Sequence, residues 1–389
     1  MNEKIRIPDL EGLMNRHTPQ FDSSIFDNYK EANRLIIIGN GFDLAHGLKT
    51  SFKDFIEDYS YKILSKIKRN LHYEDDLISI TSHVYFSDLN INLETLEKSK
   101  VYEKFMDVKK RDRITVERQS EFLKSIFHSI EEKSWVDIEL VFFEFLRIAS
   151  KTNDSKKITK VNSDLESLKK KLNHYLKEEI QRVELIVSDG LFKQFTQNIS
   201  INETIPNTIR KNLIPKGICV LNFNYTSLPL KYLEKIRVIN PIYIPIHGEL
   251  YGDDITKQGI VFGYGDELDK DYLEFENLNN DVLFEHIKSF KYLHFDHYRK
   301  MLEFINNGPF QVHLYGHSCG LSDRTLLNTI FENENCISIK NFYYSNNGKD
   351  DYEQKSYAIA RHFKNKADLR AKVVNKTKCE PMVQPKDEK

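Results

Sequence analysis

Cysteine is scarce in this sequence, and no two cysteines form a recognisable motif. The chain has four, namely Cys219, Cys319, Cys336 and Cys379. Because no C-x-x-C pair occurs, the sequence gives no sign of a zinc module or a disulfide framework. Cys219 and Cys336 lie in strand-like runs, where a small buried thiol is the simplest interpretation.

An excess of charge of one sign and long apolar runs are also missing. Lys and Arg number 57 against 58 Asp and Glu in 389 residues, which leaves a formal net charge of -1. Composition therefore gives no electrostatic reason to expect nucleic acid or an anionic membrane as a partner. No apolar run approaches the roughly 20 residues that cross a bilayer, and the N-terminal stretch is too polar for a secretory signal. We expect a cytoplasmic protein in a reducing compartment, with no membrane partner.

Proline and glycine are absent from a long central stretch. No proline lies between Pro19 and Pro206, and no glycine lies between Gly47 and Gly190. Charged residues alternate there with Leu, Ile and Phe at helical spacing, most clearly in "SDLESLKKKLNHYLKEEIQRVELIV". Ser163 followed by Glu166 has the pattern of a helix-capping box. We predict a helical insertion over residues 62–204.

Strand-like runs lie on both sides of this stretch. The first, "RLIII", ends in Gly39-Asn40-Gly41, and a helix is predicted from about Ser51, with Asp54 as its N-terminal signal. After residue 205 come "GICVLNFNY", "PIYIPIHGEL", "GIVFGYGDE", "FQVHLYGHS" and "CISIKNFYYS". Short apolar runs with polar residues at their ends are typical of buried parallel strands. We predict a doubly wound, Rossmann-like α/β fold with a mostly parallel sheet, interrupted by the helical insertion after its first β-α unit.

The predicted organisation therefore has five parts. They are a leader (1–32), the first β-α unit (33–61), the helical insertion (62–204), the rest of the α/β domain (205–370) and a flexible tail (371–389).

The glycines after the first strand indicate a ligand site. Gly39 and Gly41 lie where a strand gives way to a helix, and without a Cβ they allow a tight turn and a close approach to a phosphate group. The spacing to Gly47 departs from G-x-G-x-x-G, which disfavours an ordinary dinucleotide-dependent dehydrogenase.

Several blocks resemble a known family. "IIIGNGFDLAHGLKTSFKDF" is similar to the opening signature of the AbiH family of bacterial phage abortive-infection proteins, and "SWVDIEL", "LNFNYT", "IPIHGEL" and "YGHSCGLSD" resemble its later blocks in the same order. Together they span about residues 35 to 345. The resemblance implies a role in defence against phage.

The same blocks resemble, more distantly, the sirtuin-like NAD-binding proteins. The segment "GNGFDLAHGLK" is similar to their diphosphate loop, "NFNYT" to a T-x-N-[IY]-D block, "HG" to a His-Gly block and "YGHSCGLSD" to a late G-x-S-x-x-D block. The resemblance implies that NAD is bound by Gly39, Asn40, Gly41, Phe42, Asp43, Gly47, Thr226, Gly248, Gly316, His317, Ser318 and Asp323.

Two departures from this pattern concern the chemistry. An acid, Asp43, stands in the diphosphate loop in place of Ser, and Thr226 stands where an acid is usual. The four-cysteine zinc module of deacylating sirtuins is missing, which argues against a peptide deacylase. NAD hydrolysis, or nucleotide binding without turnover, is then implied.

The resemblance also implies the catalytic residues. Hydrolysis of the nicotinamide–ribose bond needs a positioned water and a proton acceptor. Asn224 is expected to position the water and His247 to act as the base; the alternatives are a turn-capping Asn and a strand-end His bonded to the backbone. Gly263 and Asp266 are candidates for ribose binding, with an ordinary turn as the alternative.

Other candidates have simpler interpretations. Glu139, in "SWVDIEL", faces either the site or solvent. His294 and His297 have helical spacing but no evident third ligand, so no metal is predicted.

The leading hypothesis is an anti-phage effector that binds NAD and hydrolyses it to ADP-ribose and nicotinamide. The first alternative is a nucleotide-binding sensor without turnover. The second is a toxin directed at nucleic acid, suggested by the runs "KSKVYEKFMDVKKRDR" and "LKKKLNHYLK" but disfavoured by their acids. Expected partners are a nucleotide, a phage-derived trigger or companion defence protein, and a second copy of the chain.

Overall fold

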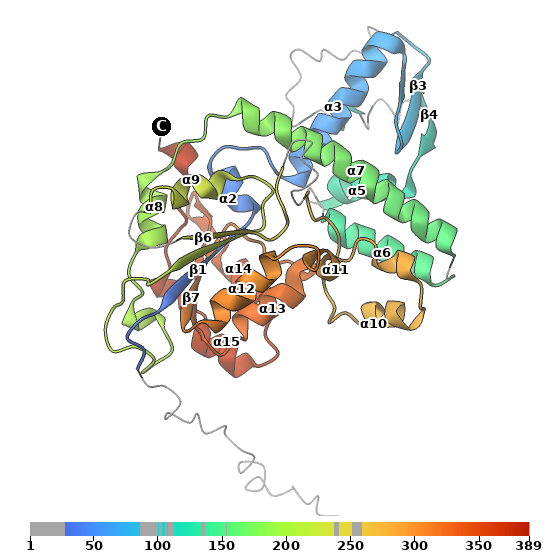
Figure 1. Ribbon diagram of the computed structural model, residues 1–389. Helices are drawn as coiled ribbons and strands as arrows, with labels where there is room; N and C mark the ends of the chain where they lie inside the picture. The colour runs from blue at the N-terminus through green and yellow to red at the C-terminus, as the bar shows by residue number, and fades with distance from the viewer. Residues whose placement is uncertain are drawn as a thin grey trace, which may run out of the picture.

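Five parallel strands form the central sheet. The computed structural model describes residues 28–85, 100, 103–105, 107, 113–133, 137–152, 154–236, 241–250 and 259–388. The strand order is β6-β5-β1-β7-β8. Figure 1 labels β6, β1 and β7 of this sheet. These strands are β1 (Asn33–Ile38), β5 (Ile218–Asn222), β6 (Ile242–Pro245), β7 (Phe310–Tyr315) and β8 (Cys336–Phe342). The prediction of a doubly wound α/β fold is confirmed.

The strand order creates a switch point beside β1. From β1 the chain adds β5 and β6 on one side, and then crosses to add β7 and β8 on the other. The connections that leave β1 and β7 therefore diverge, and a crevice forms at the carboxyl ends of these strands. Six strands were predicted for the sheet, and one of them, "GIVFGYGDE", is wrong. In this segment Tyr264 makes only an isolated bridge with Ile287.

Helices cover both faces of the sheet because its strands are apolar on both. Ile36 and Ile38 face α2 (Asn40–Ala45), α8 (Asp189–Thr196) and α9 (Leu228–Leu233). Leu35 and Ile37 face α12 (His297–Asn306), α13 (Arg324–Phe331) and α14 (Tyr352–Ala360). Successive residues of a strand therefore point to opposite faces of the sheet and are buried in one of two separate hydrophobic cores.

The insertion has its own core, but it is not purely helical. It comprises α3 (Phe52–Asn70), β2 (His72–Glu74), β3 (Ile78–Ser82), β4 (Ile114–Gln119), α5 (Glu121–Lys133), α6 (Ile138–Ser150) and α7 (Ser155–Arg182). The antiparallel sheet β2-β3-β4 corrects the helical prediction. In β3, Ile78 and Ile80 alternate with Ser79 and Thr81, which is the pattern of a strand and differs from the helical spacing of the neighbouring segments.

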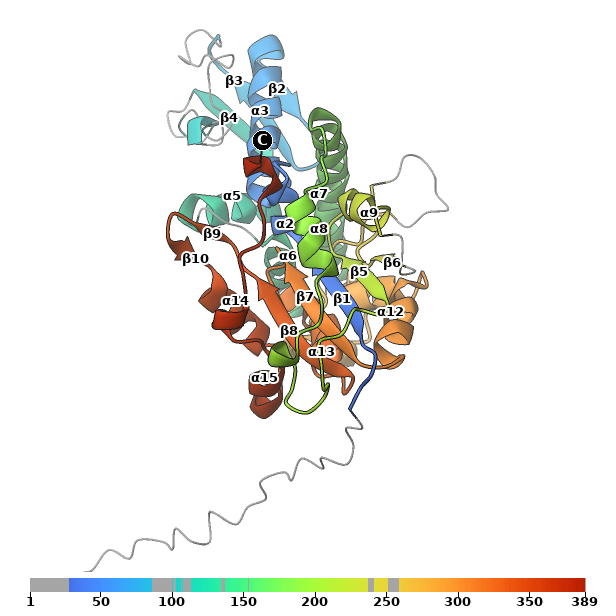
Figure 2. The same cartoon turned by 90° about the vertical axis from the view of Figure 1, so that its left-hand side faces the viewer.

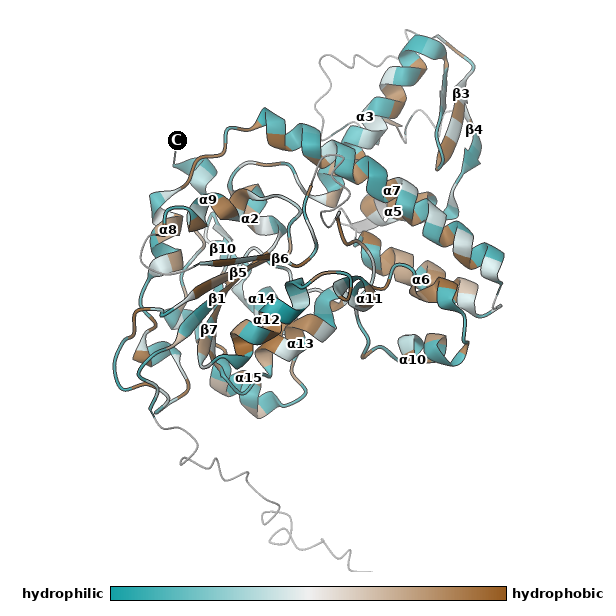
Figure 3. Cartoon of the chain, in the orientation of Figure 1, coloured by the Kyte–Doolittle hydropathy of each residue, from teal (hydrophilic) through white to brown (hydrophobic). Residues whose placement is uncertain are grey.

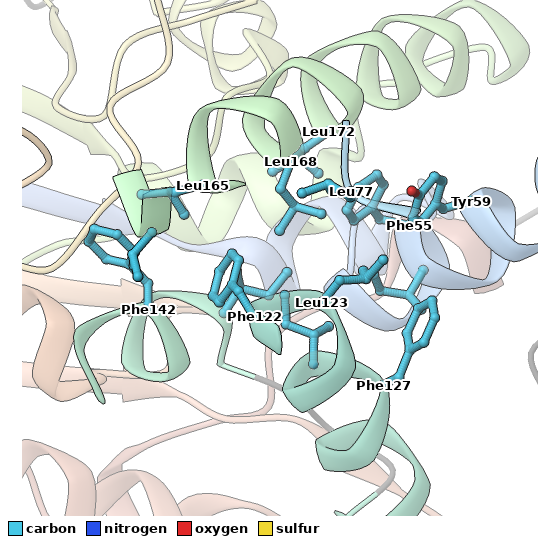
Figure 4. Packing of buried hydrophobic residues seen from close by; sticks show 14 of the residues in the cluster. Phe55, Tyr59, Leu77, Phe122, Leu123, Phe127, Phe142, Leu165, Leu168 and Leu172 are labelled. Atoms are coloured by element: carbon cyan, nitrogen blue, oxygen red, sulfur yellow. The ribbon is translucent and has the colours of Figure 1, made fainter. Parts of the chain in front are cut away.

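Large apolar side chains from helices and strands of the insertion meet in this core. Figure 4 shows Phe55 and Tyr59 of α3, Phe122 of α5, Phe142 of α6 and Leu168 of α7 turned toward one another. Along α7, hydrophobic and hydrophilic residues alternate as in an amphipathic helix (Figure 3).

Helix α7 begins earlier than its sequence pattern predicts. Its N-cap is Asp154, whose side chain accepts a hydrogen bond from the Lys156 N–H. The capping box predicted at Ser163 and Glu166 is wrong, because both residues lie inside the helix. The helix start predicted at about Ser51, with Asp54 as its signal, is confirmed, and these two residues form a capping box at the start of α3.

The boundary between the two regions differs from the predicted one. Helix α8 lies within 62–204 but packs on the sheet. Conversely, residues 260–287 belong to the predicted α/β part but bury Phe262, Tyr264 and Phe275 in the core of the insertion. This segment contains α10 (Lys270–Asn277) and η4 (Asp281–Phe284), and α11 (Lys288–Tyr292) follows it.

The C-terminal segment packs against the sheet, so the predicted flexible tail at 371–389 needs correction for its described residues. After α15 (Lys366–Lys372), Val373 forms a bridge with Ile339 of β8, and Pro381 forms one with Tyr343. Met382 is buried. The tail satisfies backbone groups along an edge strand that would otherwise be open (Figure 2).

The remaining elements are short. They are the hairpin β9 (Ser345–Asn346) and β10 (Lys349–Asp350), and the 3₁₀ turns η3 (Ile201–Glu203), η5 (Leu321–Asp323), η6 (Lys376–Lys378) and η7 (Pro385–Asp387). The predicted leader, 1–32, falls outside the described residues up to residue 27. Within the described part of the chain, no helix is both long and apolar enough to cross a membrane.

Candidate functional site

A cavity of about 470 Å³ lies at the switch point of the sheet. Its walls come from the turn after β1, from the ends of β5, β6 and β7, and from α3, α6 and α7 of the insertion. The lining residues are Gly39, Asn40, Gly41, Asp43, Thr50, Ser51, Phe52, Lys53, Asp137, Glu139, Leu172, Leu176, Phe223, Asn224, Tyr225, Thr226, His247, Gly316, His317, Ser318, Ser322 and Asp323. This volume is within the range of small-molecule sites, roughly 300–1,000 Å³.

Three glycines interlock at the base of the cavity. A Cβ on Gly39 would lie 2.5 Å from His317 Cα, and one on Gly41 would lie 2.7 Å from Gly316 Cα. Gly316 has φ +64, and a Cβ there would lie 2.3 Å from the Phe42 nitrogen. The Gly41 N–H donates to the Gly316 carbonyl at 2.9 Å. Glycine is required at these positions because a side chain would prevent the backbone turns after β1 and β7 from packing against each other.

Asp43 and Thr226, the two residues that depart from the sirtuin-like pattern, are hydrogen-bonded to each other. The Thr226 hydroxyl lies 3.0 and 2.9 Å from the two carboxyl oxygens of Asp43. Burial raises the pKa of Asp43 to about 7, although the hydrogen bonds from Thr226 and Asn224 oppose the shift. The Asn224 amide also donates to the Gly39 carbonyl at 3.1 Å, which fixes the end of β5 against the glycine turn.

Asp323 is the centre of a buried cluster on the opposite wall. Its Oδ1 lies 2.8 Å from Lys288 Nζ and 3.2 Å from His247 Nε2, and its Oδ2 lies 3.6 Å from His317 Nε2. Burial alone would raise the pKa of Asp323, but the Lys288 charge and the His247 hydrogen bond hold it well below its usual range.

Both histidines of this cluster are neutral near pH 7. Burial, with help from Lys288, lowers the pKa of His247. Burial lowers the pKa of His317 to about 3. The His317 Nδ1 accepts the Cys319 N–H at 3.0 Å, so its proton is on Nε2, toward Asp323.

Glu139 joins the insertion to this cluster. Its Oε2 accepts from Lys288 at 2.7 Å and its Oε1 accepts from the Gly263 N–H at 3.1 Å. Burial raises the pKa of Glu139 to about 7. The charge of Lys288 opposes this shift only in part, because Lys288 also pairs with Asp323. The buried ammonium of Lys288, the first residue of α11, thus connects the carboxylates of Glu139 in α6 and Asp323 in η5.

The sequence model of the bacteriophage abortive infection family AbiH matches residues 35–345, which is most of the chain. The chain belongs to the AbiH family. AbiH membership implies a role in abortive infection, a defence against bacteriophage. A comparison with curated proteins finds no match.

Most of the site residues predicted for this AbiH chain line one cavity. They are Gly39, Asn40, Gly41, Asp43, Asn224, Thr226, His247, Gly316, His317, Ser318 and Asp323. Apart from Asp323 in η5, these residues follow the ends of four strands, β1, β5, β6 and β7, so the fold brings them together as the strand-end argument predicts.

Five predicted residues lie outside the cavity lining. Phe42 is in the core beneath α2. Gly47 (φ +86) and Gly248 (φ +75) form turns. Gly263 is pressed against the His286 carbonyl, and Asp266 pairs with Arg324 at 3.2 Å. Gly263 and Asp266 therefore make contacts outside the cavity lining, and ribose binding by them stays a prediction.

Two residues of the site could not be assigned from the sequence: Lys288 was not predicted, and Glu139 was expected to face either the site or solvent. Lys288 follows "DVLFEHI", which mixes apolar residues with Asp281, Glu285 and His286, so local sequence gives no clear signal that its side chain is buried. Among the described residues there is no group of three or more His, Cys, Asp or Glu side chains arranged to hold a metal ion.

Proposed function

We propose that the chain binds NAD in this cavity and hydrolyses its nicotinamide–ribose bond, so that loss of NAD limits phage growth. The main support is the convergence of the glycine turn with Asn224, His247 and Glu139 around one cavity at the switch point. Doubly wound sheets bind nucleotides at such points. The distant resemblance to sirtuin-like proteins supports NAD as the nucleotide.

The diphosphate is assigned to the glycine side of the cavity. Because the Gly41 N–H is already bonded to Gly316, side chains must supply donors there. The ammonium of Lys53 lines this side and is such a donor, whereas the hydroxyls of Thr50 and Ser51 already donate to the side chains of Asn40 and Asp54. Thr50 is held by a 2.5 Å hydrogen bond to the Asn40 side chain, which orders the wall.

The bond cleavage needs stabilisation of positive charge and one proton acceptor. Nicotinamide leaves as a neutral molecule, and the ribose becomes cationic until water adds. The carboxylates of Glu139 and Asp323 would stabilise that charge. Neutral His247 accepts the proton of the water, and Asp323 beside its Nε2 stabilises the imidazolium that forms. Asn224 orients the water.

The test is incubation of the purified chain with NAD and separation of products by liquid chromatography. We expect release of nicotinamide, reduced at least about 100-fold in His247→Ala and Asn224→Ala. His72→Ala is the matched control, because His72 is exposed in β2 and does not line the cavity. Intact NAD in the presence of phage lysate would contradict the proposal.

One observation favours a sensor without turnover as the second candidate. The carboxyl oxygens of Asp323 and Glu139 already receive hydrogen bonds from Lys288, His247 and the Gly263 N–H. A site whose polar groups satisfy one another can bind a nucleotide without activating water. Retention of NAD by the purified chain, with no product, would support this candidate.

No observation favours a nucleic-acid toxin. In the run on α7, Lys169 lies 3.2 Å from Glu166 and Lys171 lies 2.8 Å from Asp75, so their charges are paired. The other lysine-rich run lies largely outside the described residues. A phage-derived trigger or companion protein and a homo-oligomer stay predictions from the sequence.

A further inference from the structure

The charged side chains that line the cavity are mostly acidic. Asp137, Glu139 and Asp323 are on the side built by α6 and η5, and Asp43 is beside the glycine turn. Among the described lining residues, Lys53 is the one lysine or arginine, and it is exposed. A ligand that enters the cavity therefore meets an excess of carboxyl groups.

Lys288 does not cancel this excess on the side that faces a ligand. Its side chain is 0% exposed and does not line the cavity, whereas the side chains of Glu139 and Asp323 are each 10% exposed and do. The ammonium lies behind the two carboxylates, at 2.7 and 2.8 Å. The wall thus presents carboxyl groups to a ligand and keeps their counterion in the protein. Because the pKa of Glu139 is about 7, its negative charge is full only above about pH 8.

The other walls of the cavity are flat and apolar. Phe52, Phe223 and Tyr225 line it together with Leu172 and Leu176. The Phe223 ring packs edge-on against the rings of His247 and His317, with centroids 5.0 and 4.2 Å apart, and is held in place. Aromatic walls combined with carboxylates suit a flat organic cation.

We infer that the cavity selects the positively charged pyridinium ring, so that its substrates are N-ribosylpyridinium compounds such as NAD, and not NADH or nucleosides of neutral bases. This inference rests on the proposed function and adds its substrate class. When the C1′–N bond breaks, both electrons leave with the ring nitrogen and the ring becomes neutral. The charge passes to the ribose, water adds to C1′, and a proton is released. The neutral ring then loses its attraction to the wall and departs.

The test compares two probes that differ in charge. 1-Methylnicotinamide is a permanent cation, and nicotinamide is the neutral parent ring. We expect the cation to bind the full-length chain roughly tenfold tighter in isothermal titration calorimetry. NADH should likewise compete poorly with NAD.

Two variants and a control connect the preference to the wall. Asp137→Asn removes a charge but keeps the cap that accepts the Leu140 N–H, so the fold is retained. We expect it to reduce the preference severalfold, and Glu139→Gln to do the same. Glu121→Gln removes an exposed carboxylate elsewhere in the insertion (73% exposed) and should leave the preference unchanged.

The outcomes separate this inference from the proposed function. Equal affinities, tighter binding of nicotinamide, or no binding of either probe would overturn the inference. NAD hydrolysis combined with equal affinities would leave the function standing and the inference wrong. A preference for the cation without any hydrolysis would keep the inference and reject the function.

Discussion

The α/β domain and the insertion bury their apolar residues in different ways. The sheet strands are buried on both faces and divide their side chains between two cores. The insertion surrounds one core with amphipathic helices and a small sheet, and takes in residues 260–287 as well. The cavity lies where these regions meet. The α/β domain supplies tight backbone turns to it, and the insertion supplies Glu139 and Asp137. A charged wall that neither region could form alone results from their contact.

The largest expected effect comes from removing the cation that joins the two regions. Lys288→Met leaves the carboxylates of Glu139 and Asp323 buried without a counterion, which should cost about 3–5 kcal/mol of unfolding free energy. Lys160→Met breaks a 2.7 Å pair with Asp164 on α7, where the lysine is 61% exposed, and should cost no more than about 1 kcal/mol. Urea unfolding measures both, and equal losses would show that the junction is not held by this ammonium.

The glycine turn offers the next largest effect. Gly316 and Gly348 have similar positive φ values, +64 and +76, but nothing lies within 4 Å of a Cβ placed on Gly348. We expect Gly348→Ala to cost about 1 kcal/mol from backbone strain alone. Gly316→Ala should cost at least about 2 kcal/mol more, because its Cβ meets the Phe42 nitrogen at 2.3 Å. Similar thermal shifts for the two variants would reject the interlock.

A pH-dependent effect is expected at Asp43. Because its folded pKa is raised to about 7, above the ~3.9 of an unfolded chain, its contribution to stability is full below pH 4 and is lost as the pH rises through 7. Asn keeps an acceptor for the Thr226 hydroxyl and never ionises. Asp43→Asn should therefore be more stable than the parent by roughly 4 kcal/mol at pH 8 and equal to it near pH 4. A difference that does not change with pH, in urea titrations at both values, would contradict the assignment.

The smallest expected effect is the loss of a helix cap, and it distinguishes Ser51 from Ser163, which has a similar sequence pattern. Ser51 caps α3, with its side chain accepting the Asp54 N–H at 3.1 Å, and Ser51→Ala should cost about 1 kcal/mol. Ser163 has the same pattern but lies inside α7, where Ser163→Ala should be neutral or slightly stabilising. Calorimetric unfolding of both variants checks this, and a loss at Ser163 as large as at Ser51 would be unexpected.

The fold class and much of the cavity lining could be predicted from the sequence alone. Apolar runs that end in polar residues identify buried parallel strands, and their carboxyl ends must lie at one edge of the sheet. Gly39, Asn224 and His247 could be placed together for this reason, whereas Asp323 was expected there only from the sirtuin-like resemblance. The five central strands, the amphipathic α7 and the cap at Ser51 are local properties, set by side-chain spacing within a few residues.

Only the tertiary structure decided the rest. The pairing of β2, β3 and β4, the packing of residues 260–287 with the insertion and the docking of the C-terminal segment on β8 depend on partners far away in the chain. Lys288 illustrates the physical reason. Nothing near it in the sequence is charged to match it except Glu285, and its role arises because folding buries it between carboxylates 149 and 35 residues distant. Burial and long-range charge pairing set the pKa values of Glu139 and Asp323, and neither is encoded in local spacing.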